Sequence, residues 1–151
     1  MNEQERPPHT LTGFAAAAAA FVSAVDGNRQ RIAQDAGLTR TELRALFRVA
    51  QLVSVTPKEL AEYLSMTTGA ITAISRRLVD IGLFTRVDHP ADRRSLHLKL
   101  TERGHDVMQG IHRDFNAMLT ASTSGLDAAQ LEAFSTALFS VAGEVRARTG
   151  R

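Results

Sequence analysis

Two adjacent arginines, Arg93 and Arg94, lie in a short polar segment between two apolar stretches of this chain. Asp92 comes directly before them, where its carboxylate can orient a guanidinium through a charge-assisted hydrogen bond. Pro90 is tolerated in this segment because a loop needs no ladder hydrogen bond. The spacing predicts a hairpin loop over residues 89–94 whose arginines reach a negatively charged partner.

A second group of polar residues precedes this loop: Thr67, Thr68, Gly69, Thr72 and Arg76. Thr68 and Thr72 are four residues apart, so in a helix they share one face. Threonine hydroxyls can bond to DNA base edges and their methyl groups can touch thymine, while an arginine one turn further could reach a phosphate or a guanine. Taken alone, such a row is more often a solvated helix face.

The elements that would position these residues follow from hydrophobic periodicity. Four apolar residues recur at helical spacing and predict the buried side of a helix over residues 67–81, with Ser75 turned away from the core. They are Ile71, Ile74, Leu78 and Ile81. Residues 83–88 and 95–100 predict two strands, the second with its leucines facing inward. Together with a short helix before them, they form the layout of a winged helix-turn-helix, which binds DNA.

Three helix starts carry a capping box, in which Thr or Asp is followed three residues later by Glu or Gln. The pairs are Thr39 with Glu42, Thr56 with Glu59, and Asp127 with Gln130. They predict helices over residues 39–52, 56–64 and 127–147. A long helix is also predicted over residues 10–35, with Gly37 just past its end, and Thr101 is predicted to begin another that runs to about residue 120.

The first and last long helices have apolar faces wider than a small DNA-binding module could cover. Apolar surface of that kind marks an interface, and a palindromic DNA site requires a twofold dimer. The residues predicted to make the homodimer contact are Phe14, Leu131, Phe134 and Leu138. The predicted fold is mainly α with a small β-hairpin wing. A disordered tail (1–9) precedes one domain (10–151), in which dimerisation helices (10–36 and 104–148) flank the winged helix-turn-helix (38–103).

Composition restricts the classes of function. The chain has 151 residues, 44% of them hydrophobic and 23% charged, and no long uncharged apolar run, so we expect a cytoplasmic globular protein with no membrane partner. It has no cysteine, which excludes disulfides and thiolate catalysis. The net charge is only +2, but residues 65–103 hold seven basic and four acidic side chains, a local excess that suits a polyanion.

Enzymatic and metal-dependent functions have little support. His105 and His112 are seven residues apart, but a metal site needs three or four convergent ligands, so we expect neither a metal nor another cofactor. The chain has no Ser-His-Asp order, glycine-rich phosphate loop or HExxH motif, and we expect no enzyme.

The order of elements and three segments resemble the MarR family of bacterial transcription regulators. The segments are MTTGAITAISRRL (Met66 to Leu78), GLFTRVDHPADRR (Gly82 to Arg94) and LKLTERG (Leu98 to Gly104). The resemblance implies an obligate homodimer on a pseudo-palindromic DNA operator, with Thr67, Thr68, Gly69 and Thr72 near base edges. It also implies that Arg94 enters the minor groove while Asp92 holds it in place. Ala73 departs from the many relatives that have Arg there, so one contact is missing and a different operator is expected.

Three functional hypotheses stay open at this point. The first, which the resemblance favours, is a repressor released by a small effector, often aromatic or phenolic. The second is a DNA-binding dimer that responds to no effector. The third is a protein-interaction module that has lost DNA binding.

Overall fold

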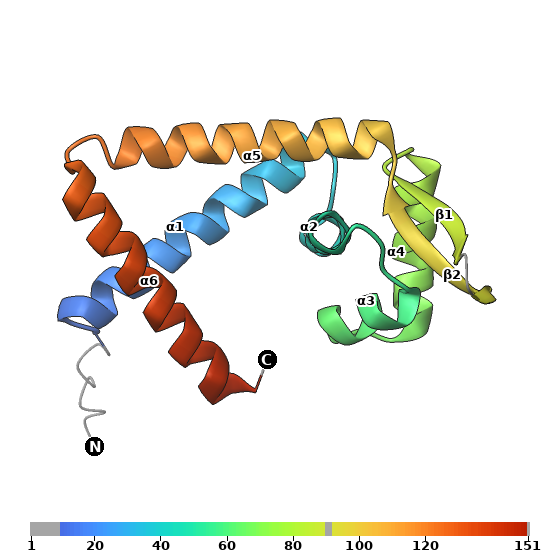
Figure 1. The fold of residues 1–151 in the computed structure, drawn as a ribbon, viewed down its shortest axis with the longest axis horizontal. Coiled ribbons are helices and arrows are strands. Elements are labelled where there is room, and N and C mark those ends of the chain that lie inside the picture. The colour runs from blue at the N-terminus through green and yellow to red at the C-terminus, as the bar shows by residue number, and fades with distance from the viewer. Residues whose placement is uncertain (1–9, 90–91, 151) are drawn as a thin grey trace, which may run out of the picture. The chain divides into compact units, whose positions relative to one another are not determined.

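The computed structural model describes residues 10–89 and 92–150, without the side chains of residues 89 and 92–95 (Figure 1). Over these residues the elements follow in the order α1 (Gly13–Asp35), α2 (Arg40–Leu52), α3 (Pro57–Leu64), α4 (Thr68–Asp80), β1 (Phe84–His89), β2 (Asp92–Leu100), α5 (Glu102–Ser122) and α6 (Ala128–Thr149). The prediction of a mainly helical fold with a small hairpin is confirmed. None of the helices in this part of the chain combines the length and the apolar character needed to cross a bilayer. The tail predicted over residues 1–9 lies outside the described residues.

The chain forms two compact units. One runs up to Met108 and holds the elements from α1 to β2 with the first turns of α5, and the other begins at Gln109 and holds the rest of α5 and α6. The single domain expected over residues 10–151 stays a prediction.

Local hydrogen bonds start three of the helices, as predicted. The Thr39 hydroxyl accepts a hydrogen bond from the Glu42 N–H at 3.2 Å, and the Thr39 N–H donates to the Glu42 carboxylate at 2.8 Å. The same reciprocal pair forms at the other two capping boxes. Each box satisfies backbone donors that the first helical turn leaves unpaired. The helices that begin there are α2 (Arg40–Leu52), α3 (Pro57–Leu64) and α6 (Ala128–Thr149).

The first helix, α1 (Gly13–Asp35), ends in a turn that leads into α2. Gly37 follows the helix as predicted, at a φ of +65°, which glycine adopts without steric cost. The Leu38 N–H then donates to the Ala33 carbonyl at 2.8 Å, and both side chains are buried. The turn between α1 and α2 is therefore closed by local contacts.

The core of the first unit lies where α2, α3, α4 (Thr68–Asp80) and the hairpin meet. Each of these elements contributes apolar side chains with almost no exposed surface. The largest are Leu43, Leu46, Val49, Val55, Leu60, Ile71, Leu78, Phe84 and Leu98. Removal of their apolar surface from water stabilises the fold by roughly 25 cal/mol per Å². This core fixes which side of α4 faces inward and which faces solvent.

The two strands, β1 (Phe84–His89) and β2 (Asp92–Leu100), pair as an antiparallel hairpin from Phe84 opposite Leu100 to His89 opposite Asp92. The base of this hairpin is attached to the loop between α2 and α3. There Val55 and Leu98 exchange two backbone hydrogen bonds, of 3.1 and 2.8 Å. The wing is thus held at its base by more than its own two strands.

The strands extend further than predicted. Because β2 begins at Asp92, the backbone of Asp92, Arg93 and Arg94 belongs to a strand, and the loop predicted over residues 89–94 is wrong in extent. Ladder hydrogen bonds join backbone groups whatever the side chains, so a strand continues after apolar alternation stops. The prediction that the leucines of the second strand face inward is wrong for Leu96, which is 38% exposed while Leu98 is buried. Leu96 is exposed because the hairpin arm extends beyond the core.

Thr101 begins α5 (Glu102–Ser122), as predicted, and joins that helix to the base of the hairpin. Its hydroxyl accepts a hydrogen bond from the Gly104 N–H at 3.0 Å and donates to the Gly82 carbonyl at 2.6 Å. Gly104 packs so closely on the hairpin that an added Cβ would overlap the Leu83 carbonyl oxygen. The glycine in the segment LTERG is therefore required by close backbone approach.

Candidate nucleic-acid interface

The solvent-facing side of α4 brings together the residues that the sequence predicted to contact DNA. Thr68, Gly69, Thr72 and Arg76, here named the α4 row, are all exposed. Thr67 comes just before them and is also exposed, and its hydroxyl accepts a hydrogen bond from the Ala70 N–H at 3.3 Å, which caps the helix. An added Cβ on Gly69 would meet no atom within 4 Å, so nothing in the described fold requires glycine there.

The donor of the Thr72 hydroxyl is already used within the helix. It donates to the Thr68 carbonyl at 2.9 Å. The oxygen lone pairs and the methyl group remain on the exposed side. Thr72 can therefore accept a hydrogen bond from a base amino group, such as adenine N6 or cytosine N4, and can contact a thymine methyl.

Ser75 does not point outward as predicted. It is 3% exposed and lies with Ile71 and Leu78 on the buried side of α4, and its hydroxyl has no hydrogen-bond partner among the described atoms. Ile74 and Ile81, predicted to be buried, are only partly covered. Positions 71, 75 and 78 lie on one side of a helix just as positions 71, 74 and 78 do. The prediction placed Ile74 rather than Ser75 in the core only because isoleucine is apolar, and it was wrong.

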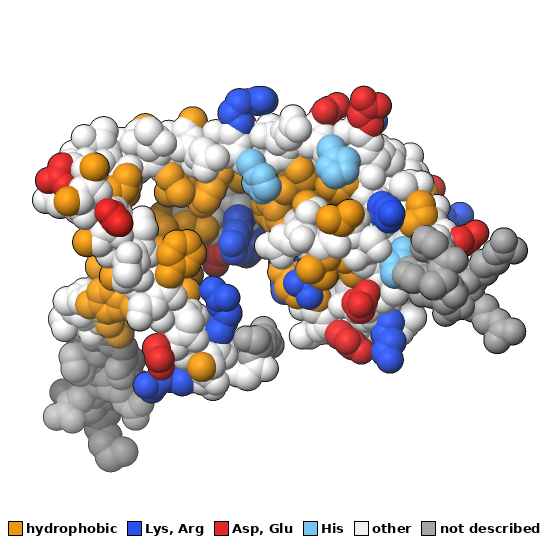
Figure 2. Space-filling model, viewed as in Figure 1, with side chains coloured by type: hydrophobic (Ala, Val, Ile, Leu, Met, Phe, Trp, Pro, Cys, Tyr) orange, Lys and Arg blue, Asp and Glu red, His pale blue; other side chains and the backbone are white. Residues whose placement is uncertain are grey.

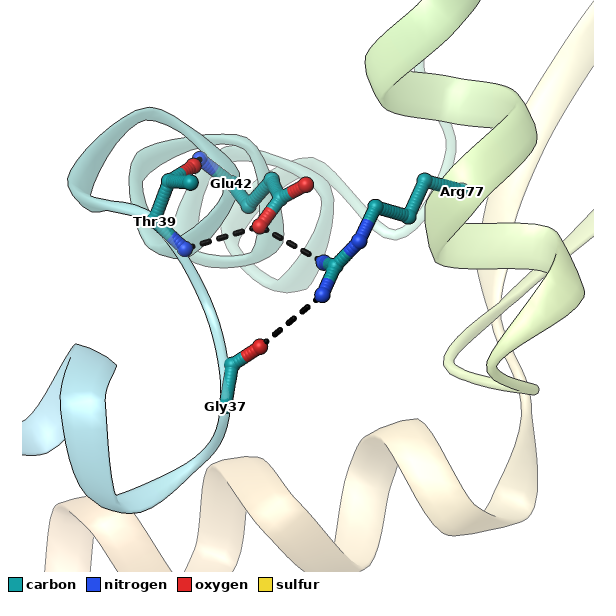
Figure 3. A network of polar contacts seen from close by, with 4 residues as sticks. All are labelled: Gly37, Thr39, Glu42 and Arg77. Carbon is teal, nitrogen blue, oxygen red and sulfur yellow. Dashed lines mark hydrogen bonds and ion pairs between the residues drawn. The ribbon is translucent and has the colours of Figure 1, made fainter.

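Arg77 is a functional candidate that the sequence did not single out. Its guanidinium bonds to the Glu42 carboxylate at 2.8 Å and to the Gly37 carbonyl at 3.1 Å (Figure 3). The neighbouring Arg76 makes no ion pair among the described residues. Two adjacent arginines thus differ in role, because one is committed to protein acceptors and the other belongs to the α4 row.

A polar contact also joins the wing to the loop that leads into α3. The Ser54 hydroxyl lies 2.7 Å from Nδ1 of His97 on β2. Glu59 lies close by, and hydrogen bonds from the backbone and hydroxyl of Thr56 lower the pKa of its carboxyl below the ordinary range. Burial raises the pKa by less than these hydrogen bonds lower it, and the nearby His97 and Arg48 charges lower it by still smaller amounts. The capping box of α3 is therefore electrostatically linked to the base of the wing.

Two further arginines are anchored on one tyrosine. The guanidinium carbons of Arg48 and Arg44 lie 4.5 and 5.8 Å from the ring centroid of Tyr63, within the range of cation–π attraction. The pair links α2 to α3, and no spacing in the sequence indicated it.

The wing arginines are placed by their backbone alone. Arg93 and Arg94 follow Asp92 on β2, on the arm of the hairpin beyond its attached base. Their side chains, and that of Asp92, lie outside the described residues. The minor-groove role of Arg94 and the orienting role of Asp92 remain predictions.

Comparison with known proteins identifies the family. The family model described as MarR family matches residues 38–96, the winged helix-turn-helix. The Multiple antibiotic resistance protein MarR of Escherichia coli is 30% identical over 99 residues, which cover 63% of this chain and 69% of that protein. The chain belongs to the MarR family. It is therefore a transcription regulator with a DNA-binding winged helix-turn-helix. The family is one of transcription regulators and not of enzymes.

Other relatives agree with this assignment. The Transcriptional repressor MprA of Escherichia coli is 31% identical over 86 residues, 56% of this chain and 49% of that protein. Among solved structures, RV1404 from Mycobacterium tuberculosis superimposes with a TM-score of 0.73 at 24% identity and covers 91% of this chain and 97% of its own. A MepR mutant of S. aureus bound to an oligodeoxyribonucleotide gives 0.66 at 15% identity, with 89% of this chain and 99% of its own covered. These structural likenesses show the MarR-family fold.

The predicted dimerisation residues of this MarR-family chain are all exposed. Phe14 on α1 is 71% exposed, and Leu131, Phe134 and Leu138 on α6 are 39%, 48% and 41% exposed. None of the residues of α6 is buried, although apolar side chains lie on its surface (Figure 2). Uncovered apolar surface of this kind is typical of an interface.

The histidine and carboxylate side chains of the described residues form no metal centre. Among them, no group of three or more His, Asp and Glu side chains is arranged to hold a metal ion. His105 and His112 are both exposed on α5, in different compact units.

Proposed function

We propose that this chain is a homodimeric repressor that reads a pseudo-palindromic DNA operator and is released by a small effector. The α4 row is the observation that carries the proposal. Its side chains are exposed, and all but that of Arg76 are short. The opposite side of α4 is fixed by the core, and this arrangement suits insertion into a major groove about 12 Å wide. Membership of the MarR family and the name of the repressor MprA support the same function. We place its action in the cytoplasm, where the operator would lie.

The homodimer is supported by the uncovered apolar surface of α6. A twofold dimer would present two α4 rows to successive major grooves, about 34 Å apart along the duplex. The wing arginines would then reach the adjacent minor grooves, whose narrow, electronegative form attracts arginine.

The effector is the part of the proposal that rests on the family alone. A small aromatic or phenolic ligand would release the repressor only if it binds the DNA-incompetent state more tightly than the competent one. A set of aromatic acids and phenols, each tested for thermal stabilisation of the protein, separates this function from an effector-independent DNA-binding dimer. Stabilisation together with loss of DNA binding supports release by an effector. Stabilisation without that loss favours the effector-independent dimer.

The wing supplies the direct test of DNA binding. The wild-type protein and the Arg94→Ala variant are titrated with a duplex that covers the promoter of the protein's own gene and with a random duplex of equal length, at several salt concentrations. We expect wild type to prefer the promoter and Arg94→Ala to bind it roughly 5- to 150-fold more weakly, since an arginine contact to a base is of the order of 1–3 kcal/mol. If wild type binds neither duplex, the protein-interaction alternative is favoured.

Asp92→Ala separates orientation from simple charge attraction. Removal of a negative charge near DNA should raise affinity if attraction alone governs the wing. If Asp92 orients Arg94 through a charge-assisted hydrogen bond, affinity should fall instead. A rise in affinity in the folded dimer would show that the orienting role is wrong.

A further inference from the structure

One polar network connects three segments that are distant in the sequence. The Arg77 guanidinium, on α4, donates through Nη1 to Glu42 Oε2 at 2.8 Å and through Nη2 to the Gly37 carbonyl at 3.1 Å. The same Glu42 oxygen accepts the Thr39 N–H at 2.8 Å, so the carboxylate that closes the capping box of α2 also holds α4 (Figure 3). The network joins α4 to the start of α2 and to the turn after α1.

The geometry separates Arg77 from the α4 row. Arg77 is five residues after Thr72, and a helix turns by 100° per residue, so the two side chains leave the helix about 140° apart. Each terminal nitrogen of the guanidinium donates one hydrogen bond to a protein acceptor. The partner carboxylate is almost completely buried, with 5% of the Glu42 side chain exposed against 48% for Arg77. Loss of the cation would leave the buried Glu42 carboxylate without a compensating charge, which is strongly destabilising. The ion pair therefore holds α4 firmly to the start of α2.

We propose that Arg77 is a positioning residue for DNA recognition. It sets the orientation of the α4 row against the α1–α2 turn, without contact with DNA, through its two-pronged bond to Glu42 and Gly37. Any displacement of α1 or its turn then reaches the DNA-contacting side chains through one side chain. This inference rests on the proposed reading of DNA by the α4 row.

Two rival roles predict different measurements. If Arg77 bound a phosphate, its loss would weaken operator and random DNA alike and reduce the salt slope by about one unit. If Arg77 only stabilised the fold, the folded variant would bind the operator as wild type does. A positioning role predicts a weaker operator complex, a much smaller change on random DNA and an unchanged salt slope.

The variants are chosen so that charge and geometry make opposite predictions. Arg77→Gln removes the cation, and Arg77→Lys keeps it but cannot serve both acceptors in the guanidinium geometry. Glu42→Gln removes a negative charge while keeping the capping box, which accepts Gln at that position. Arg76→Gln is the matched control, one residue away, with the same charge change on the exposed α4 row.

The experiment measures the affinity of each full-length variant for the promoter duplex and for the random duplex at several salt concentrations, after urea unfolding shows that the variant is folded. We expect Arg77→Gln and Glu42→Gln each to weaken promoter binding by about tenfold and Arg77→Lys to rescue it only partly, with random DNA changed by less. The double variant Arg77→Gln with Glu42→Gln should bind the promoter no more weakly than the worse of the two single variants, since both substitutions disrupt the same network. The double variant also serves if Arg77→Gln alone fails to fold, because it leaves no uncompensated buried carboxylate.

Several results would overturn the inference. A reduced salt slope with equal losses on both duplexes would make Arg77 a phosphate contact, and unchanged promoter affinity in the folded variants would make it structural only. Tighter binding by Glu42→Gln would show that net charge governs the site. These outcomes are distinct from failure of the proposed function itself, in which wild type would not discriminate between the two duplexes.

Discussion

Gly104→Ala should destabilise this protein, although Gly→Ala within a helix normally does the opposite. An exposed helical glycine changed to alanine stabilises by roughly 0.5–1 kcal/mol, because the unfolded chain loses freedom. At Gly104 the new Cβ would overlap the Leu83 carbonyl oxygen and lie 3.3 Å from Leu100 Cβ. That carbonyl also accepts the Thr101 N–H at 3.1 Å, so it cannot withdraw without loosening the start of α5.

The expected cost follows from these contacts. Overpacking of a close contact costs about 1–3 kcal/mol, and a weakened backbone hydrogen bond costs about 1 kcal/mol more. After subtraction of the ordinary gain from alanine, we expect a net loss of about 1–3 kcal/mol. For a chain of this length each kcal/mol shifts Tm by about 2–4 °C, so Tm should fall by roughly 2–12 °C.

The assay is thermal unfolding followed by circular dichroism, at fixed protein concentration because association would itself raise Tm. Gly69→Ala is the matched control, since its added Cβ meets nothing within 4 Å, and its Tm should stay level or rise slightly. The reasoning is refuted if Gly104→Ala is as stable as Gly69→Ala.

Three other predictions concern DNA binding, association and pH. Thr72→Ala should narrow the difference in affinity between promoter and random DNA without changing the salt slope. Arg76→Ala, as loss of a phosphate contact, should weaken the binding of both duplexes and reduce the salt slope by about one unit. Equal losses on both duplexes for Thr72→Ala would mean that α4 does not read sequence there. Phe134→Glu, which places a charge on the apolar surface of α6, should convert the dimer to monomer or aggregate in analytical ultracentrifugation, and a wild-type protein that sediments as a stable monomer at micromolar concentration would contradict the dimer. The hydrogen bonds from Thr56 lower the pKa of Glu59 below its ordinary value of 4.5, so the stability that Glu59 contributes is present above that value and is lost as pH falls through the lowered pKa. Glu59→Gln should therefore flatten the acid side of stability measured by urea unfolding against pH, and an unchanged profile would show that this carboxylate contributes nothing.

The features that the sequence predicted well are the local ones. A capping box joins residues three apart, so Thr39 and Glu42 report their own hydrogen bonds wherever the helix packs. The exposed side of α4 was also predictable, because Thr68, Thr72 and Arg76 repeat at helical spacing.

The features that the sequence missed depend on tertiary contacts. Glu42 and Arg77 are 35 residues apart, and no periodicity relates them. Ser75 is buried because α4 packs with that side inward, which overrides the polarity of one hydroxyl. The start of β2 at Asp92, before the predicted strand over residues 95–100, depends on pairing with β1. The polar residues there show no alternation that would indicate a strand.

The backbone bridge between Val55 and Leu98 divides the wing thermodynamically. Below it, the hairpin shares a hydrophobic core and a third segment of backbone, so its amides should exchange with solvent only when the unit unfolds. Above it, from Asp88 opposite Leu96 outward, the described backbone pairs only between the two strands of the arm, and a two-stranded hairpin is marginally stable in water. Insertion of that arm into a DNA groove would therefore be opposed by conformational entropy, of about 1–2 kcal/mol for each residue that becomes fixed. Operator affinity should then increase on cooling by more than rigid docking would predict, as the entropic cost of ordering the arm declines with temperature.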